Sequence, residues 1–247
     1  MLGLGSSLTT GGVSSAWTPA DLGSKLKVWY RYNTGIEESD TSFPEDGEAV
    51  TKWTDQSGQG NDATKSSQLP EYNATENAIF FDGSTDSMDI NGSTGLTLTT
   101  FSVYQRVKFK EVGETLGGEF LWTKNTGTTG QNWIKVQNGD EIRTKLGNSG
   151  RKDFTLASTM GEATKYNIGM ERNSSSEVRV YIDGAVASNG SGGESHTIDK
   201  DSKQFELDDL CFPADGMYIY EAIVTTNALS ASERTLLDAW LDSETEG

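Results

Sequence analysis

The sequence predicts an all-β protein: an antiparallel sandwich of two sheets followed by one short C-terminal helix. Short runs of alternating apolar and polar residues recur along the chain, and Asp-Gly or Asn-Gly pairs separate many of them. No long helical pattern lies between these runs, which favours an all-β class. A chain of 247 residues can form one sandwich, so we expect a single domain over residues 17–247 and an extended arm over residues 1–16.

The composition fits a thin core between two sheets whose outer faces are solvated. Hydrophobic residues make up only 34% of the chain, but 6 Trp, 8 Tyr and 9 Phe each bury a large area. The formal net charge of -17 repels phosphate backbones and anionic membranes, so we expect neither nucleic acid nor membrane as a partner. The single cysteine, Cys211, excludes an intrachain disulfide.

The expected strands begin shortly after the arm. A helical turn with Pro19 at its first position precedes a strand over residues 26–31. Further strands are expected over residues 78–81, 101–108, 119–124, 133–137, 141–146, 154–157, 166–171, 178–182, 204–207 and 217–225. The residue pairs typical of tight hairpins occur at 82–83, 91–92, 138–139, 183–184, 189–190 and 215–216.

One helix is expected at the C-terminal end. Ser230 and Glu233 have the spacing of a capping box, in which each side chain bonds the other residue's backbone N–H. Four apolar residues then fall on one helical face, which should pack on the sandwich: Leu236, Leu237, Trp240 and Leu241.

Residues 53–64 form a loop of turn-forming residues between two expected strands. Its Asp, Asn and Ser side chains can bond their own backbone, and its glycines allow positive φ. Asp55, Asn61 and Asp62 also offer the hard oxygen ligands that Ca²⁺ prefers. The spacing is not that of an EF-hand, and two Asp make a weak cage, so we favour a rigid structural turn over a calcium site. No other cofactor is expected.

Six motifs, taken in order, resemble a known family. They are Trp17-Thr-Pro-Ala-Asp-Leu, Val28-Trp-Tyr, the loop 53–64, Phe81-Asp-Gly-Ser, Val180-Tyr-Ile-Asp-Gly, and Tyr220-Glu-Ala-Ile-Val followed by Leu229-Ser-Ala-Ser-Glu-Arg. Together they resemble the concanavalin A-like (laminin-G-like) jelly roll of bacterial secreted proteins and of tailed-bacteriophage virion proteins. The resemblance covers roughly residues 17–243 and implies a two-sheet jelly roll.

The arm MLGLGSSLTTGG resembles the N-terminal arms of small virion proteins of tailed phages, including marine cyanobacterial ones. This resemblance implies a structural protein of the virion, either a capsid decoration or a head, neck or tail appendage, assembled in the host cytoplasm. Other virion proteins would be its partners, and it would form a homo-oligomer. The arm has no secretion signal, and its apolar residues would anchor it: Leu2, Leu4, Leu8 and Val13.

An enzymatic function is not expected, although some concanavalin A-like folds are glucanases. A retaining glycosidase needs two carboxylates about 5–5.5 Å apart, as a Glu-x-Asp-x-x-Glu strand provides. The nearest match begins at Glu206 and Asp208 and has Cys211 where the second catalytic acid should stand. His196, the only histidine, has no partner for a catalytic or zinc set and is expected in a solvated loop.

The alternative function is a carbohydrate-binding adhesin or tail-fibre receptor module for host-surface glycans. Such a site would combine aromatic platforms with polar contacts. Trp122, Trp133 and Tyr181 could supply the platforms, while Asp86, Asp89 and Asn132 could supply the polar contacts.

Overall fold

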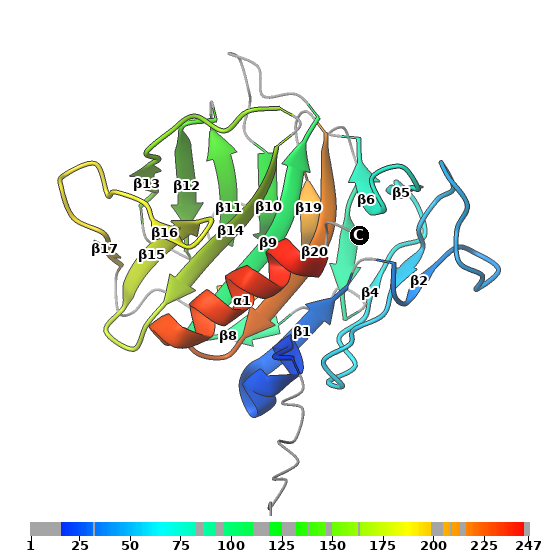
Figure 1. Ribbon diagram of the computed structural model, residues 1–247, viewed down its shortest axis with the longest axis horizontal. Coiled ribbons are helices and arrows are strands. Elements are labelled where there is room, and N and C mark those ends of the chain that lie inside the picture. Colours follow the sequence, from blue (N-terminus) through cyan, green and yellow to red (C-terminus); the bar gives the residue numbers. More distant parts are fainter. Residues whose placement is uncertain are drawn as a thin grey trace, which may run out of the picture.

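The computed structural model describes residues 16–31, 33–82, 86–91, 96–110, 119–124, 132–137, 139–146, 150–162, 164–198, 205–207, 209–212 and 216–244. The proposed anchors of the arm lie outside this set, and so does most of the arm. The described residues form a sandwich of two nine-stranded sheets with one helix on its outside (Figure 1).

The first sheet, called here the helix-side sheet, has the order β16-β15-β14-β9-β20-β6-β5, with β1 paired to β20 and β17 to β15. Its strands are β1 Leu26–Tyr30, β5 Glu71–Asn73, β6 Ala78–Phe81, β9 Phe101–Phe109, β14 Lys165–Arg172, β15 Glu177–Ile182, β16 Ala185–Val186, β17 His196–Thr197 and β20 Met217–Thr225. Long antiparallel pairings of β9 with β14 and β20 form its centre.

The second sheet, called here the opposite sheet, has the order β13-β12-β11-β10-β19-β7-β4-β3-β2. Its strands are β2 Ile36–Glu37, β3 Lys52–Trp53, β4 Ala63–Thr64, β7 Met88–Ile90, β10 Glu119–Lys124, β11 Asn132–Gln137, β12 Glu141–Lys145, β13 Lys152–Thr155 and β19 Asp209–Phe212. A separate antiparallel pair joins β8 Leu96–Leu98 to β18 Phe205–Leu207. The expected two-sheet antiparallel architecture is confirmed.

The main core lies between the two sheets and is rich in large apolar side chains. Alternate residues of a strand point to the same face, and a register shift between Ile219 and Glu221 moves this alternation by one residue in β20. The inner face of β20 is therefore built from Met217 and Ile219 before the shift and from Val224 after it, and all three are buried. Trp53 of the opposite sheet is fully buried and stacks on Tyr30 with 5.4 Å between ring centroids. A core of this kind supplies most of the stability through removal of apolar area from water.

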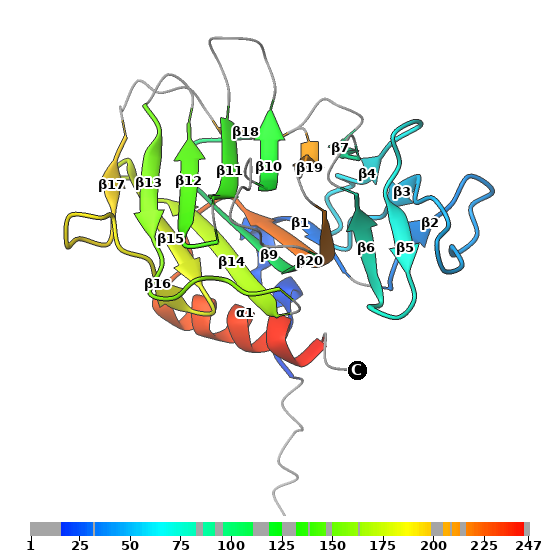
Figure 2. The same ribbon diagram turned by 90° about the horizontal axis from the view of Figure 1, so that it is seen from above.

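A second core lies on the outer side of the helix-side sheet, beneath α1 (Ala231–Glu244) and the 3-10 helix η1 (Pro19–Lys25). Figure 2 shows α1 outside that sheet, on the side away from the opposite sheet. Leu237 and Leu241 are fully buried there, as the helical pattern predicts. Leu236 is 42% exposed, so its assignment to the buried face was wrong, because the contact face of α1 is narrower than expected.

No helix in the described part of the chain has the length and apolar character needed to cross a lipid bilayer.

The capping box predicted for the helix start is confirmed. Ser230 N donates to Glu233 Oε2 at 2.8 Å, and Glu233 N donates to Ser230 Oγ at 3.3 Å. Lys25 at the end of η1 donates to Glu233 Oε1 at 2.5 Å, so one carboxylate caps α1 and also ties it to η1. The hydrogen bond from Lys25 lowers the pKa of Glu233 from 4.5 to about 2, and the bonds from Ser230 act in the same direction.

Replacing Glu233 with glutamine is expected to remove a pH-dependent part of the stability. A lowered pKa in the folded state means that the charged carboxylate stabilises the fold above pH 4.5, and that this contribution is lost as the pH falls toward 2. Glutamine keeps the cap but loses the charge, so the expected loss at pH 7 is at most about 1 kcal/mol. Urea unfolding of both proteins from pH 7 to pH 2 should show a difference that shrinks toward zero. A difference that stays constant over this range would contradict the prediction.

Candidate functional site

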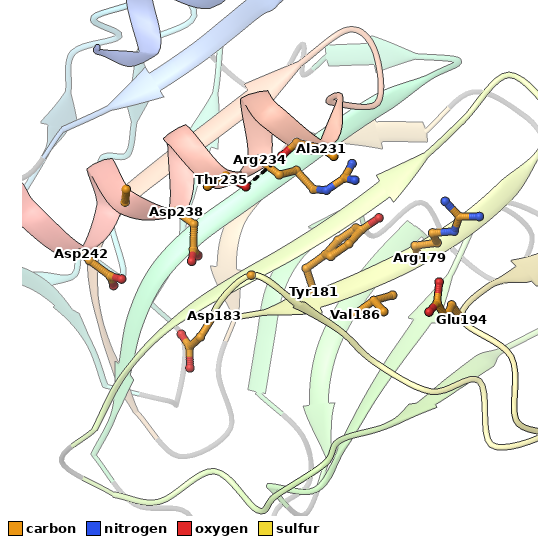
Figure 3. A pocket seen from close by; sticks show the side chains of 12 residues that line it. Arg179, Tyr181, Asp183, Val186, Glu194, Ala231, Arg234, Thr235, Asp238 and Asp242 are labelled. Atoms are coloured by element: carbon orange, nitrogen blue, oxygen red, sulfur yellow. Dashed lines mark hydrogen bonds between the residues drawn. The ribbon is translucent and has the colours of Figure 1, made fainter. Parts of the chain in front are cut away.

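A groove of about 650 Å³ lies between α1 and the β15–β16 hairpin (Figure 3). Its volume falls within the range of small-ligand sites. Tyr181 lies between the two ends of the groove. Arg179 and Arg234 gather at one end, and three carboxylates gather at the other: Asp183, Asp238 and Asp242.

The hairpin turn places the first of these carboxylates. Asp183 and Gly184 have φ values of 47° and 75°, the left-handed conformations that a two-residue hairpin turn requires. A Cβ at Gly184 would lie 3.0 Å from Asp238 Oδ2, so glycine also lets the helix carboxylate approach the turn closely. The Asp-Gly pair, predicted as a turn, therefore also shapes the acidic end of the groove.

Asn167 of β14 connects the turn to the helix at this acidic end. Its N–H donates to Asp183 Oδ1 at 2.8 Å, and its Nδ2 donates to Asp238 Oδ1 at 2.8 Å and to Asp242 Oδ1 at 3.1 Å. Arg106 of β9 donates to Asn167 Oδ1 at 2.9 Å and to Asp242 Oδ1 at 2.7 Å. Asp238 and Asp242 thus share the side-chain amide of Asn167, Asp242 also accepts a bond from Arg106, and Asp183 accepts from the backbone N–H of Asn167. Three carboxylates beside one guanidinium leave a local excess of negative charge.

Burial raises the pKa of Asp183 and of Asp238 above 3.8. The charge of Asp242 acts in the same direction on both groups, while the bonds from Asn167 oppose the rise. Asp183 and Asp238 are therefore held at a higher pKa than solvent-exposed aspartates have. A ligand that donates hydrogen bonds would stabilise the charged forms.

The other end of the groove rests on a buried glutamate, Glu171 of β14. Tyr104 donates its hydroxyl to Glu171 Oε1 at 3.1 Å, and Arg234 of α1 donates to Glu171 Oε2 at 3.0 Å. Arg234 also donates to the carbonyl of Leu229 at 2.6 Å, and its guanidinium carbon lies 4.7 Å from the centre of the Tyr181 ring. These contacts fix the Arg234 side chain against the floor of the groove.

The rim of the groove is formed by more accessible groups. The side chain of Arg179 is 40% exposed, and its contact with Glu177 is loose, at 3.6 Å. Glu194 lies near Arg179 in Figure 3, and both Glu194 and Thr235 are exposed. The groove therefore presents cationic donors, carboxylate acceptors and a hydroxyl group within one cavity.

Among the proposed sugar contacts whose side chains the structure describes, only Tyr181 lines this groove. Tyr181 is 6% exposed and its ring lies beneath Arg234, so most of the ring is covered, and its role as a sugar platform stays a prediction. Asp86 is buried and accepts a bond from Asp82 N at 3.0 Å. Asp89 lies on β7 of the opposite sheet and pairs with Lys65 at 2.6 Å.

The remaining three proposed sugar contacts lie on β10 and β11 of the opposite sheet. The register pairs Trp122 with Ile134 and Trp133 with Lys145, while Asn132 begins β11. The side chains of these three residues lie outside the described part of the structure. Since Tyr181 belongs to the helix-side sheet, the backbone does not bring the predicted platforms together into one site.

The loop proposed as a calcium site is held by hydrogen bonds within the protein. Asp55 is 7% exposed, and its carboxylate accepts bonds from Trp29 N, Ser57 N and Oγ, and Asn61 N at 2.7–3.0 Å. Asp62 accepts a bond from Asp55 N at 2.9 Å. The described residues contain no group of three or more His, Cys, Asp or Glu side chains placed to hold a metal ion.

Two residues weighed for chemistry lie elsewhere than expected. His196 is part of β17, with its Nε2 2.8 Å from the carbonyl of Asp153 and its ring against Phe154, so its assignment to a solvated loop was wrong. Glu206 and Cys211 lie on two different strands, β18 and β19, which belong to different sheets. The stretch that was compared with a catalytic strand motif therefore does not form a single strand.

No family model matches the sequence, and no curated protein matches it. Among solved structures, Trypanosoma rangeli sialidase is similar over 89% of this chain and 33% of its own, with a TM-score of 0.59 and 13% identity. Its complex with sialic acid gives a TM-score of 0.59 and 12% identity over the same shares of the two chains. The botulinum neurotoxin serotype D ligand binding domain in complex with N-acetylneuraminic acid is similar over 92% of this chain and 53% of its own, with a TM-score of 0.61 and 13% identity.

These likenesses confirm the expected fold, a concanavalin A-like sandwich with a C-terminal helix. The chain spans about a third of the sialidase and about half of the toxin domain that it resembles. At such low identity the likeness concerns the fold alone.

Proposed function

We propose that this chain is a non-catalytic carbohydrate-binding domain and that the groove between α1 and the β15–β16 hairpin holds the saccharide. The observation that carries the proposal is the mixture of groups around one cavity. Arg179 and Arg234 offer only donors, the aspartates offer only acceptors when charged, and Thr235 offers both.

A saccharide has the complementary chemistry. Each hydroxyl group is both a donor and an acceptor, so a sugar satisfies a cavity in which fixed donors and fixed acceptors lie at opposite ends. A purely apolar ligand would leave these charged groups without water or a partner, which is unfavourable. A strongly anionic ligand would meet the local excess of negative charge at Asp183, Asp238 and Asp242. The groove therefore favours a neutral saccharide or the neutral part of a larger glycan.

The similar solved structures support a saccharide as the ligand class. The sialidase structure is a complex with sialic acid, and the toxin domain structure is a complex with N-acetylneuraminic acid. A carbohydrate ligand thus recurs in proteins that contain this fold, although the chain spans only part of each of them.

The arrangement of the carboxylates supports binding without catalysis. Glycoside hydrolysis requires one carboxyl group that gives up a proton and a second that attacks or activates water. Asp183 and Asp238 instead both accept bonds from the same residue, Asn167, which positions the hairpin against the helix. We assign these two carboxylates to shaping the groove and to accepting bonds from sugar hydroxyls.

Filling the groove tests this function. Replacing Ala239, an exposed helix residue that lines the groove, with tryptophan is expected to reduce saccharide binding at least about tenfold, because the indole occupies the space of the ligand. The matched control is Leu236→Trp, since Leu236 is exposed on the same helix but does not line the groove. A glycan array that includes neutral and sialylated oligosaccharides identifies the ligand, and calorimetry with the best of them compares the variants.

Two results would contradict the proposal. One is an array without any saccharide signal at millimolar ligand, and the other is equal affinity for Ala239→Trp and the wild type. Loss of binding in Leu236→Trp as well would point to the exposed helix face and away from the groove.

The virion role predicted from the sequence stays a prediction. The arm anchors Leu2, Leu4, Leu8 and Val13 lie outside the described residues, and none of the solved structures named above is a virion protein. The two roles are compatible, since a domain that binds glycans could be carried on a particle.

A further inference from the structure

A second cluster of side chains lies on the outer face of the helix-side sheet and shares no residue with the groove. We call it the lysine–aromatic patch and define it by Phe80, Tyr218, Lys108, Lys110 and Lys165. The antiparallel register pairs Phe80 with Tyr218, Tyr218 with Lys108, and Lys108 with Lys165. Four of the five residues therefore form one row across β6, β20, β9 and β14, and Lys110 follows β9.

The two rings of the patch form a partly exposed apolar surface. The centroids of Phe80 and Tyr218 lie 4.8 Å apart, with an angle of 38° between the rings. Both side chains are partly exposed, whereas their strand neighbours Ile79 and Ile219 are buried in the main core. Two adjacent, partly exposed rings can contact a ligand about the size of one sugar ring.

The lysines surround these rings with positive charge. The Nζ atom of Lys110 lies 5.1 Å from the centre of the Phe80 ring, and that of Lys108 lies 5.6 Å from the centre of the Tyr218 ring. Lys165 lies over Tyr220, with its Nζ 4.4 Å from the ring centre. Each ammonium group thus makes a cation–π contact with an aromatic ring, on the outer face of the helix-side sheet.

The acidic groups beside the patch are occupied or peripheral. Glu76 accepts bonds from Lys108 and from the Tyr220 hydroxyl, both at 2.6 Å. Glu71 is exposed and pairs with Phe80 at the β5 edge of the row. Lys110 is exposed and makes no ion pair with any residue that the structure describes. Among the residues that the structure describes, the exposed ammonium group of Lys110 therefore gives a local positive charge on a chain whose net charge is -17.

We propose that the lysine–aromatic patch is a second binding site, specific for a saccharide residue that bears a carboxylate. The carboxylate pairs with the Lys110 ammonium group, and the apolar C–H face of the sugar ring lies against Phe80 and Tyr218. A charge-assisted bond of this kind is stronger than a bond between neutral groups. The site therefore distinguishes an acidic sugar from a neutral one, whereas the groove favours the neutral kind.

The charge distribution argues for a small anion and against an extended one. A polyanion such as a nucleic acid or a long acidic peptide would reach past the patch onto a surface whose overall charge is strongly negative. A single carboxylate on a compact ring stays within the reach of the lysines. Acetate carries the charge without the ring, and glucose carries the ring without the charge, so the two together serve as matched probes.

The test titrates ¹⁵N-labelled full-length protein with glucuronate and with N-acetylneuraminate, using glucose and acetate as controls. We expect chemical-shift changes at the patch with either acidic sugar, and an affinity for each that is at least about tenfold higher than for glucose or acetate. Lys110→Gln is expected to weaken acidic-sugar binding about tenfold, because it removes the charge and keeps most of the side-chain volume. The control Lys145→Gln changes a lysine of β12, on the opposite sheet, and should leave the affinity unchanged.

The site is tested separately from the groove by repeating the titration with Ala239→Trp, in which acidic-sugar binding should persist. Absence of binding at millimolar acidic sugar would overturn the proposal. Equal affinity in Lys110→Gln would also overturn it, and so would equal affinity for acetate. Binding of a short poly-glutamate peptide with the same dependence on Lys110 would show an acidic-peptide site and would overturn the assignment to a saccharide.

Discussion

Replacing Gly169 with alanine is expected to lower the free energy of unfolding by about 3 kcal/mol, the upper end of what overpacking a core costs. Gly169 lies in the middle of β14 and is paired directly with Tyr104 of β9. A Cβ at Gly169 would lie 2.2 Å from Tyr104 Cε1 and 2.5 Å from Cζ, far inside van der Waals contact. The Tyr104 ring therefore occupies the space that any other residue at 169 would need.

The Tyr104 ring cannot move away easily. It is buried beneath α1 in the second core, and its hydroxyl is bonded to Glu171, which in turn accepts a bond from Arg234. A displaced ring would break this chain of bonds and push on the helix. Gly169→Ala is therefore expected to disturb the groove as well as the stability, since Arg234 borders the groove.

Urea unfolding of purified protein measures this effect, and two further variants make it specific. Gly150→Ala is the matched control, because a Cβ there meets no atom of the described residues within 4 Å and the backbone is not in the left-handed region. This change should stay within about 0.5 kcal/mol. On a Tyr104→Ala background, the effect of Gly169→Ala should fall below about 1 kcal/mol, since the clashing ring is gone. An undiminished effect on that background would show that the ring is not the cause.

The longer strands and the helix could be predicted because each carries a repeating pattern. The expected strands 78–81 and 217–225 have the bounds of β6 and β20, and the box at Ser230 marks the start of α1. Of the strands of two or three residues, β18 was expected over residues 204–207, but others such as β4 and β16 were not predicted, since so few residues cannot show an alternation. Their pairing depends on contacts with strands distant in the sequence.

The groove could not be predicted for a related reason. It brings Arg179 and Asp183 of the hairpin region together with Arg234 and Asp238 of the helix, and no local pattern connects these positions. The Asp-Gly pair at 183–184 indicated the turn but not the helix that packs against it. Asn167, which bonds to both elements, looks in the sequence like an ordinary polar residue within a strand. Only the packing of α1 on the sheet shows its role.

The loop 53–64 was predicted as a rigid turn, and the structure shows what its rigidity achieves. The loop joins β3 to β4 of the opposite sheet and lies against the edge of β1, which belongs to the helix-side sheet. Gln56 N donates to the Trp29 carbonyl at 2.7 Å, and Asn61 Nδ2 donates to the Lys27 carbonyl at 2.8 Å. The loop thus covers a strand edge that would otherwise present unpaired backbone groups, and it ties the two sheets together.

Replacing Asp55 with alanine is expected to lower the free energy of unfolding by about 3 kcal/mol, because donors in the closed sandwich lose their acceptor. The N–H of Trp29 lies at the edge of β1, is buried, and donates to the Asp55 carboxylate at 2.9 Å. The N–H of Asn61 also loses its acceptor in Asp55→Ala, so the hydrogen bond that links Asn61 to Asp55 across the loop is lost. Asp55→Asn keeps one acceptor oxygen, so we expect roughly half of the loss.

Thermal and urea unfolding measure the loss, and Asp40→Ala is the control. Asp40 also accepts a bond from a nearby backbone N–H, that of Ser42 at 2.9 Å, but it lies in an exposed turn, so its removal should change the stability by less than about 0.5 kcal/mol. The same measurement in calcium and in EDTA separates the two interpretations of the loop. If the Asp55 carboxylate only accepts hydrogen bonds from the backbone, calcium changes the stability of neither the wild type nor Asp55→Ala. A stabilisation by calcium that disappears in Asp55→Ala would instead assign the loop to a metal, because only a ligand role makes the ion's effect depend on that carboxylate.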